Sequence, residues 1–124
     1  MMAIGRTHWA IPEGFIPSES PPGAGRPLLS HEAACMLNAG DVDAHIAITI
    51  YFVDHDPVGP YRLVVPAQRT LHVRFNELDD PEPVPRDTDY ASLIVSDVPI
   101  VVQHTRLDSR QAQFALLSTM AFAG

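Results

Sequence analysis

The chain has 124 residues, of which 46% are hydrophobic, and a formal net charge of −7; these values predict one globular domain, residues 1–124, with a single core. The acidic balance and the lack of a basic run argue against a nucleic-acid partner, and no apolar run is long enough for a membrane-spanning helix. Cys35 is the only cysteine, and the N-terminus lacks a signal-peptide pattern, so we expect a cytoplasmic protein without disulfides.

Short runs rich in β-branched and aromatic residues follow one another along the first part of the chain, separated by turns rich in proline and glycine. Such runs predict β-strands, because these side chains fit a pleated, half-buried surface. The predicted strands cover residues 6–11, 31–38, 44–53, 61–65 and 69–75. The proline-rich segments 17–27 and 76–87 are predicted to be surface loops.

The 44–53 run alternates most clearly. Its even-numbered side chains from residue 46 to 52 are isoleucines and a phenylalanine, which predicts that this face fills the core. An isolated domain would normally carry charges on the opposite face. That face is instead largely apolar, with Ala47, Tyr51 and Val53. The C-terminal segment is likewise expected to carry apolar residues, Leu117 and Ala121, on an outward face. We therefore expect a homo-oligomer that buries these faces.

The stretch from residue 89 to 111 joins the most apolar part of the chain to its densest group of polar side chains. Two runs, 91–95 and 98–102, are predicted to be strands separated at Ser96-Asp97. The second run leads directly into Gln103, His104 and Arg106. When a buried strand continues into a run of polar residues, those side chains usually lie at the edge of the sheet or in a functional site.

Several long strings in the chain carry a family resemblance. They are VPIVVQHTRLDSRQA at 98–112, GPYRLVVPA at 59–67 and HVRFN at 72–76. The chain resembles the sensory rhodopsin transducer family through these strings and along nearly its whole length, from IGRTHWAIPEG at 4–14 to ALLSTMAF at 115–122. The resemblance implies a small bacterial β-sandwich protein without enzymatic activity, assembled as a tetramer.

The resemblance also implies two alternative functions. One is a signal transducer that docks on a membrane photoreceptor, a microbial rhodopsin. The other is a cytoplasmic module that binds a small polar ligand, a sugar or a sugar acid, without a rhodopsin partner. Neighbouring genes for a rhodopsin or for sugar metabolism would separate the two.

Segment 112–122 is ambiguous by pattern alone. Asp108 followed by Gln111 resembles a helix capping box, whereas apolar residues at 114, 116, 120 and 122 share the parity of a strand. The resemblance implies an all-β fold, so we predict a strand here. In all, about eight strands with frequent proline and glycine turns predict an antiparallel β-sandwich.

The side chains best suited to bind a polar ligand combine an aromatic wall with hydrogen-bonding groups. They are Trp9, Glu32, Arg74, Gln103, His104 and Arg106. Parity places His104 and Arg106 on one face of their strand and Gln103 on the other, so one pocket cannot easily use all of them. Trp9 fits a core anchor better than a ligand wall, and Arg–Glu pairs on sandwiches are commonly structural salt bridges.

Catalytic and metal-binding signatures are missing from the sequence. It contains no G-x-S-x-G, H-E-x-x-H or P-loop motif, so we expect no enzyme and no cofactor. The six histidines match no familiar ligand spacing. Asp54-His55-Asp56 are consecutive loop residues without distant partners, which is weak evidence for a metal site.

Overall fold

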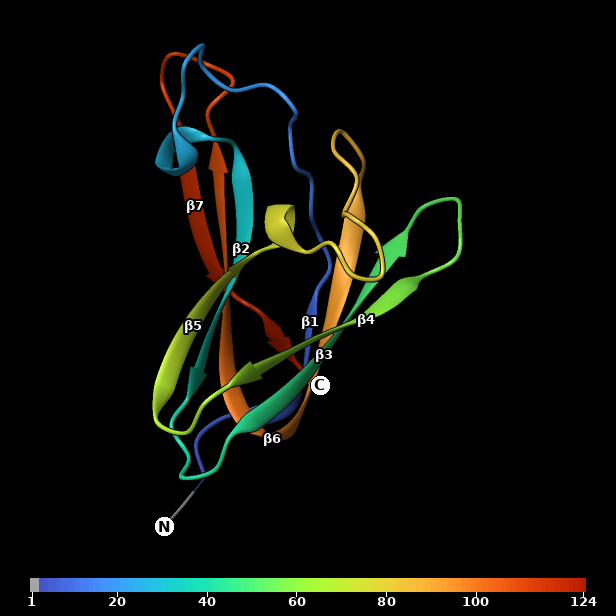
Figure 1. Ribbon diagram of the computed structural model, residues 1–124, viewed down its shortest axis with the longest axis vertical. Coiled ribbons are helices and arrows are strands. Elements are labelled where there is room, and N and C mark those ends of the chain that lie inside the picture. Colours follow the sequence, from blue (N-terminus) through green and yellow to red (C-terminus); the bar gives the residue numbers. More distant parts are fainter. Residues whose placement is uncertain (1–2) are drawn as a thin grey trace.

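Eight antiparallel strands and two single-turn 3-10 helices make up the computed structural model, which describes residues 3–124 (Figure 1). The strands are β1 (Arg6–Ile11), β2 (His31–Asn38), β3 (Ala44–Phe52), β4 (Val58–Val65), β5 (Arg69–Arg74), β6 (Tyr90–Asp108), β7 (Ala115–Met120) and β8 (Phe122–Ala123). The helices are η1 (Arg26–Leu28) and η2 (Phe75–Glu77). The predicted all-β sandwich is confirmed, and segment 112–122 contains strands and no helix.

Strand β6 belongs to both sheets of the sandwich. Its first part pairs with β3 and β1, in a sheet ordered β4-β3-β6-β1-β8. Its last part pairs with β2 and β7, and β5 completes that second sheet beyond β2. Figure 1 shows β6 curving at the lower end of the molecule as it passes from one sheet to the other. All eight strands are therefore linked through one 19-residue strand.

The predicted break at Ser96-Asp97 is wrong, because β6 continues through both residues. Ser96 pairs with Ile46 of β3 and is buried. The Asp97 carboxylate accepts a hydrogen bond of 2.8 Å from the backbone N–H of His45. Serine and aspartate are typical of a turn in the sequence. Here strand pairing with Ile46 accommodates Ser96, and the His45 N–H accommodates the Asp97 carboxylate. The irregularity lies instead in the pairing of β6 with β1. Arg6 lies opposite Ile100 and His8 lies opposite Val95, so the register shifts between these two residues of β1.

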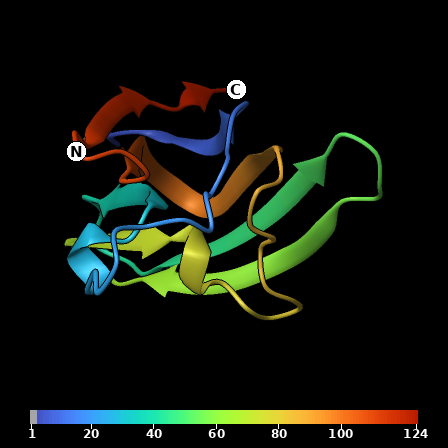
Figure 2. The ribbon, with the colours of Figure 1, turned by 90° about the horizontal axis from the view of Figure 1, so that it is seen from above.

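The core lies between the two sheets and is built from alternating side chains. Ile46, Ile48 and Ile50 of β3 are buried as the alternation predicted. They pack in one cluster with Ile94 of β6 and Met36 of β2, among others. Every residue of β7, by contrast, is exposed. Figure 2 shows β7 and β8 at the margin of the molecule, beside β1.

Candidate functional site

A fully buried carboxylate, Glu32 of β2, lies at the centre of the strongest polar cluster. Its Oε1 is 2.5 Å from Nε2 of His104, and its Oε2 accepts from Nε and Nη2 of Arg106 at 3.0 and 2.8 Å. The backbone N–H of Phe15 donates to the same Oε2. A buried carboxylate is costly unless it is paired and hydrogen-bonded. Here the neighbouring N–H groups satisfy both of its oxygens.

Strand register explains why these side chains meet. In the β2–β6 pair, Glu32 lies opposite Arg106 and Ala34 lies opposite His104. Residues directly opposite each other point to the same face of a sheet, and so do residues two apart on one strand. Glu32, His104 and Arg106 therefore share the inner face of the second sheet. On that face Glu32 is followed along β2 by Ala34 and Met36, which belong to the hydrophobic core.

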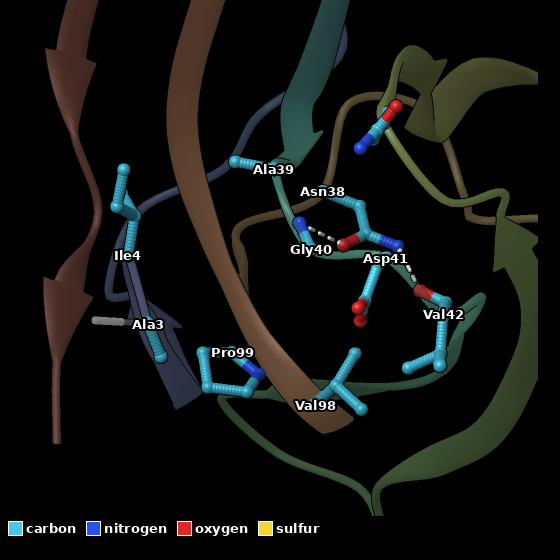
Figure 3. A pocket seen from close by; sticks show the side chains of 10 residues that line it. Ala3, Ile4, Asn38, Ala39, Gly40, Asp41, Val42, Val98 and Pro99 are labelled. Atoms are coloured by element: carbon cyan, nitrogen blue, oxygen red, sulfur yellow. Dashed lines mark hydrogen bonds between the residues drawn. The ribbon is translucent and has the colours of Figure 1, made fainter. Parts of the chain in front are cut away.

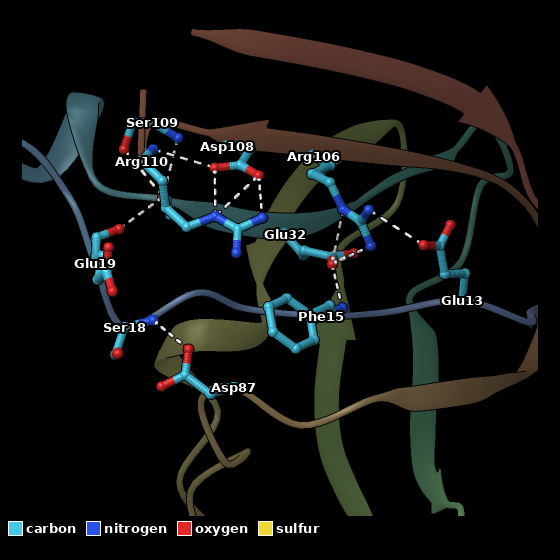
Figure 4. Close-up of polar contacts among 11 residues, drawn as sticks. Glu13, Phe15, Ser18, Glu19, Glu32, Asp87, Arg106, Asp108, Ser109 and Arg110 are labelled. Carbon is cyan, nitrogen blue, oxygen red and sulfur yellow. Dashed lines mark hydrogen bonds and ion pairs between the residues drawn. The ribbon is translucent and has the colours of Figure 1, made fainter. Parts of the chain in front are cut away.

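The segment that follows β1, residues 13–17, crosses this cluster and is here called the strap. Its backbone fastens it at three points: Phe15 N–H to Glu32, Gly14 C=O to the N–H of Tyr90, and Ile16 C=O to the N–H of Asp87. Gly14 is needed for close approach, because a Cβ there would lie 2.4 Å from the Tyr90 ring. The strap thus closes one side of the site (Figure 4).

Arg106 contacts a second carboxylate at the surface. Its Nη1 lies 3.2 Å from Oε1 of Glu13 on the strap, whose side chain is 72% exposed. Burial lowers the pKa of Arg106, but the carboxylates of Glu32 and Glu13 outweigh this effect and raise the pKa above its usual value. The guanidinium is therefore a fixed positive charge between one buried and one exposed anion, as Figure 4 shows.

A cleft of about 260 Å³ opens above this cluster. It is lined by Glu13, His104, Arg106, Leu117, Ser118 and Thr119. Register explains the contribution of β7, because Leu117 and Thr119 lie opposite Arg106 and His104. The structure thus places Leu117 on the inner face of its sheet, over the polar cluster. The cleft combines a cationic floor with an apolar wall and can hold a small polar molecule.

A second ionic group, Asp108 with Arg110, lies where the end of β6 meets the strap. Nη2 of Arg110 lies 2.7 Å from Oδ2 of Asp108, and its guanidinium carbon lies 5.7 Å from the centre of the Phe15 ring. The hydrogen bond from Arg110 lowers the pKa of Asp108. Ser18 N–H donates to Asp87 at 3.0 Å, as drawn in Figure 4. These contacts hold the strap from its outer side.

The interior also holds two hydroxyl groups of β6. Tyr90 and Ser92 are buried, and their hydroxyl oxygens have no hydrogen-bond partner among residues 3–124. Burial raises the pKa of Tyr90, and the negative charge of Glu32 adds to this effect. The phenol therefore stays neutral at ordinary pH.

Of the six predicted site residues, the structure brings together Glu32, His104 and Arg106. Trp9 is 6% exposed in the core, where its Nε1 donates to the backbone of Arg6 at 2.9 Å. Gln103 is exposed on the opposite face of β6, as parity predicted. Arg74 lies opposite Ala33 on that same outer face and donates to the backbone of Arg26.

Sequence reasoning missed the strap and the contribution of β7 to the cleft. Glu13 and Thr119 carry no motif, and only knowledge of the loop path and of strand register brings them over Arg106. The one available signal was the parity that Leu117 and Thr119 share on β7. That parity could not say which face of the sheet they would occupy.

A larger depression, of about 430 Å³, lies around the β2–β3 turn (Figure 3). Its central polar group, Asn38, is used internally. The Asn38 amide nitrogen donates to Val42 and Val65 carbonyls at 2.8 and 3.0 Å, and its oxygen accepts from Gly40 at 3.0 Å. Asn38 therefore stabilises the turn. We favour the smaller cleft as the functional site. Of the two, only this cleft has at its base a charged side chain, Arg106, that a buried partner, Glu32, holds in place.

Among residues 3–124, no group of three or more His, Cys, Asp or Glu side chains is placed to hold a metal ion. Within the same residues, no helix is long and apolar enough to cross a membrane.

Together, the fold and the cleft define a small all-β sandwich protein with a buried Glu–His–Arg cluster beneath an open surface site. The family model described as "Anabaena sensory rhodopsin transducer" matches residues 4–123. The chain belongs to this family, so the predicted resemblance is confirmed.

Two of the solved structures that are similar to this chain show the relationship. One is titled "Anabaena sensory rhodopsin transducer"; it is 60% identical, with a TM-score of 0.73, and the match covers 85% of this chain and 100% of that one. The other is titled "Crystal Structure of Thermotoga maritima 1070"; it is 31% identical, with a TM-score of 0.86, and the match covers 98% of this chain and 97% of that one. No curated protein gives a significant match.

Proposed function

We propose that this protein is a non-enzymatic signal transducer that docks on the cytoplasmic face of a membrane sensory rhodopsin. The observation that carries the proposal is the 60% identity to the Anabaena sensory rhodopsin transducer over the whole of that solved chain. Charge supports it as well. Cytoplasmic loops of membrane proteins carry an excess of lysine and arginine, and this chain has a net charge of −7.

The acidic residues are concentrated where a partner can reach them. Asp54 and Asp56 lie in the β3–β4 loop, and Asp79, Asp80 and Glu82 lie in the loop after η2; all are exposed. Figure 1 shows both loops, green and gold, near the upper right of the molecule. An acidic end of this kind suits a basic receptor surface, because complementary charge steers association.

The test is binding to a purified sensory rhodopsin, with the Anabaena receptor as the probe. Calorimetric titration in detergent micelles should show saturable binding at micromolar concentrations that weakens as salt is added. A double variant, Asp79→Asn with Asp80→Asn, should weaken binding at low salt. No detectable binding at low salt would count decisively against the proposal.

The cleft over Arg106 favours a second candidate function, a small-molecule binding module for sugars or sugar acids. Arg106 is held in one orientation by Glu32, so its outward nitrogen is ready for a ligand. A pre-oriented guanidinium suits carboxylates and vicinal hydroxyls. In a thermal-shift screen of sugars and sugar acids, a ligand at about 100 times its Kd adds about 2.7 kcal/mol of stability. A flat screen across that library would remove this candidate.

We also propose that the protein assembles as a homotetramer. Large apolar side chains remain exposed on both sheets, including Tyr51 of β3 and Leu116, Met120 and Phe122 of β7 and β8. Within residues 3–124, strand β7 pairs with β6 alone, along one of its two edges. Association of copies would bury these side chains and cover a free edge, which is how proteins commonly protect exposed strands.

A further inference from the structure

The Glu13 side chain contacts Arg106, but the strap does not need this contact to stay in place. We infer that this carboxylate is a placeholder: the cleft takes small organic acids, whose carboxylate displaces Glu13 from Arg106. The inference rests on the small-molecule binding proposed above and names the chemistry of the ligand. It also predicts that the Glu13 carboxylate and the ligand carboxylate compete for Arg106.

Arg106 divides its hydrogen-bond donors between a permanent and an exchangeable partner. Its Nε and Nη2 bind Glu32, whose side chain is 1% exposed and cannot leave without burying an unpaired charge. Its Nη1 faces Glu13, at 3.2 Å. An ion pair with one strongly exposed partner shifts an equilibrium by only a few-fold. A competing anion can therefore replace Glu13 at small cost.

The strap stays fastened without the Glu13 side chain. Its three attachments all use backbone groups, of Gly14, Phe15 and Ile16. Among residues 3–124, the Glu13 carboxylate has no polar contact other than that with Arg106. Moving the side chain away therefore leaves the strap in place. A structural salt bridge would instead be expected to tie together elements that nothing else joins.

The surroundings of Nη1 favour an acid over a neutral ligand. A carboxylate makes charge-assisted hydrogen bonds to a guanidinium, which are roughly twice as strong as neutral ones. A neutral hydroxyl in the place of Glu13 would exchange a charged partner for a weaker one. Thr119 adds a hydroxyl at the same cleft, and Leu117, 62% exposed, adds an apolar wall for the carbon face of the ligand.

The size of the cleft limits the ligand. Its volume of about 260 Å³ corresponds to about nine water molecules in the liquid. A hydroxy acid or a single sugar acid is of this scale, and a nucleotide or a peptide is not. The ligand class is therefore a small hydroxylated monocarboxylate.

The experiment compares D-glucuronate with its methyl ester, which blocks the carboxylate and keeps the ring. Binding is followed by ¹H–¹⁵N NMR at the Arg106 Nε–H and at the amides of Leu117 and Thr119. Glucuronate should shift these signals saturably, and the ester should bind roughly tenfold more weakly. In Glu13→Gln, glucuronate should bind about two- to fivefold more tightly, because the internal competitor is gone. The control Glu82→Gln removes the same charge from a distant loop and should leave the affinity unchanged.

The outcomes separate this inference from the proposals on which it rests. Equal binding of acid and ester would overturn the carboxylate preference, while a small-molecule function would stand. Unchanged or weaker binding to folded Glu13→Gln would overturn the placeholder role. If D-glucuronate, D-gluconate and L-lactate all leave the Arg106 signal unmoved at millimolar concentration, the inference fails. A flat screen with neutral sugars as well would remove the small-molecule function itself.

Discussion

Glu32 and Arg106 face each other across the β2–β6 pair, and the guanidinium donates two hydrogen bonds to a single carboxylate oxygen. The other carboxylate oxygen is left for His104. This division holds Arg106 in one orientation, with one nitrogen directed at the surface. Glu32 therefore positions the Arg106 guanidinium, and the exposed side of that guanidinium is available to another molecule.

The role of Glu32 can be tested through stability. Replacing Glu32 by glutamine removes the anionic partner of the buried His104 and leaves Arg106 with only the exposed Glu13, so Glu32→Gln should lower the free energy of unfolding by about 3–5 kcal/mol. Urea denaturation at neutral pH measures the change. Glu82→Gln, at an exposed glutamate, should change stability by less than about 0.5 kcal/mol. Equal effects of the two substitutions would show that the cluster contributes nothing of its own.

The close approach of the strap to Tyr90 gives a second prediction. In Gly14→Ala, the new Cβ would lie 2.4 Å from the tyrosine ring, so the strap or the ring must shift. Overpacking of this kind typically costs about 1–3 kcal/mol, and the Arg106 Nε–H signal should move as the Phe15 N–H is displaced from Glu32.

The matched control for this change is Gly25→Ala. A Cβ at Gly25 has only Pro27 within 4 Å, at 3.8 Å, so this substitution should be neutral or slightly stabilising. If both variants unfold at the same urea concentration, the strap does not pack as tightly on Tyr90 as the structure indicates.

Much of the fold could be predicted because its strands alternate. The bounds of β1 and β2 were predicted to the residue, and β3 and β5 differ by one residue from the predicted ranges. The continuity of β6 could not be read from the pattern. Ser96 and Asp97 have the composition of a turn, and only the contact of Asp97 with the distant His45 shows how a strand accommodates them.

The site was predictable only where it depends on parity within one strand. His104 and Arg106 were expected on one face, apart from Gln103, and the structure has them so. Trp9 and Arg74 were candidates by residue type alone, which does not say where a side chain points. Glu13 reaches Arg106 through the path of a loop, and a loop path depends on tertiary contacts such as Phe15 N–H with Glu32.

Acid should weaken the fold through carboxylates that gain partners on folding. The backbone N–H and the ring of His45 lower the pKa of Asp97, and the hydrogen bond from Arg110 lowers that of Asp108. A lowered native pKa stabilises the fold fully above the unfolded-state value, about 3.9 for aspartate. That stability is lost as the pH falls from there through the native pKa.

Asp108→Asn tests this pH dependence. The variant should be less stable than the unmodified protein at pH 7, and the difference should shrink progressively below about pH 4, where the wild-type carboxylate becomes protonated as well. Urea denaturation at a series of pH values measures the difference. A gap between the two proteins that stays constant down to pH 2 would show that Asp108 acts through packing and not through its charge.

The last prediction concerns assembly. The outer face of β3 presents Tyr51, which is 41% exposed, next to the exposed Val53. If this face is buried between copies, Tyr51→Glu places an uncompensated charge in an apolar interface and should dissociate the assembly. Circular dichroism should still report a folded β-protein, because Tyr51 is not part of the core cluster. Gln113→Glu, which adds the same charge in the exposed turn before β7, is the control and should leave the assembly intact. Light scattering decides the matter. The unmodified protein should have about four times the mass of a 13.6 kDa chain, and a monomer across the micromolar range would contradict the prediction.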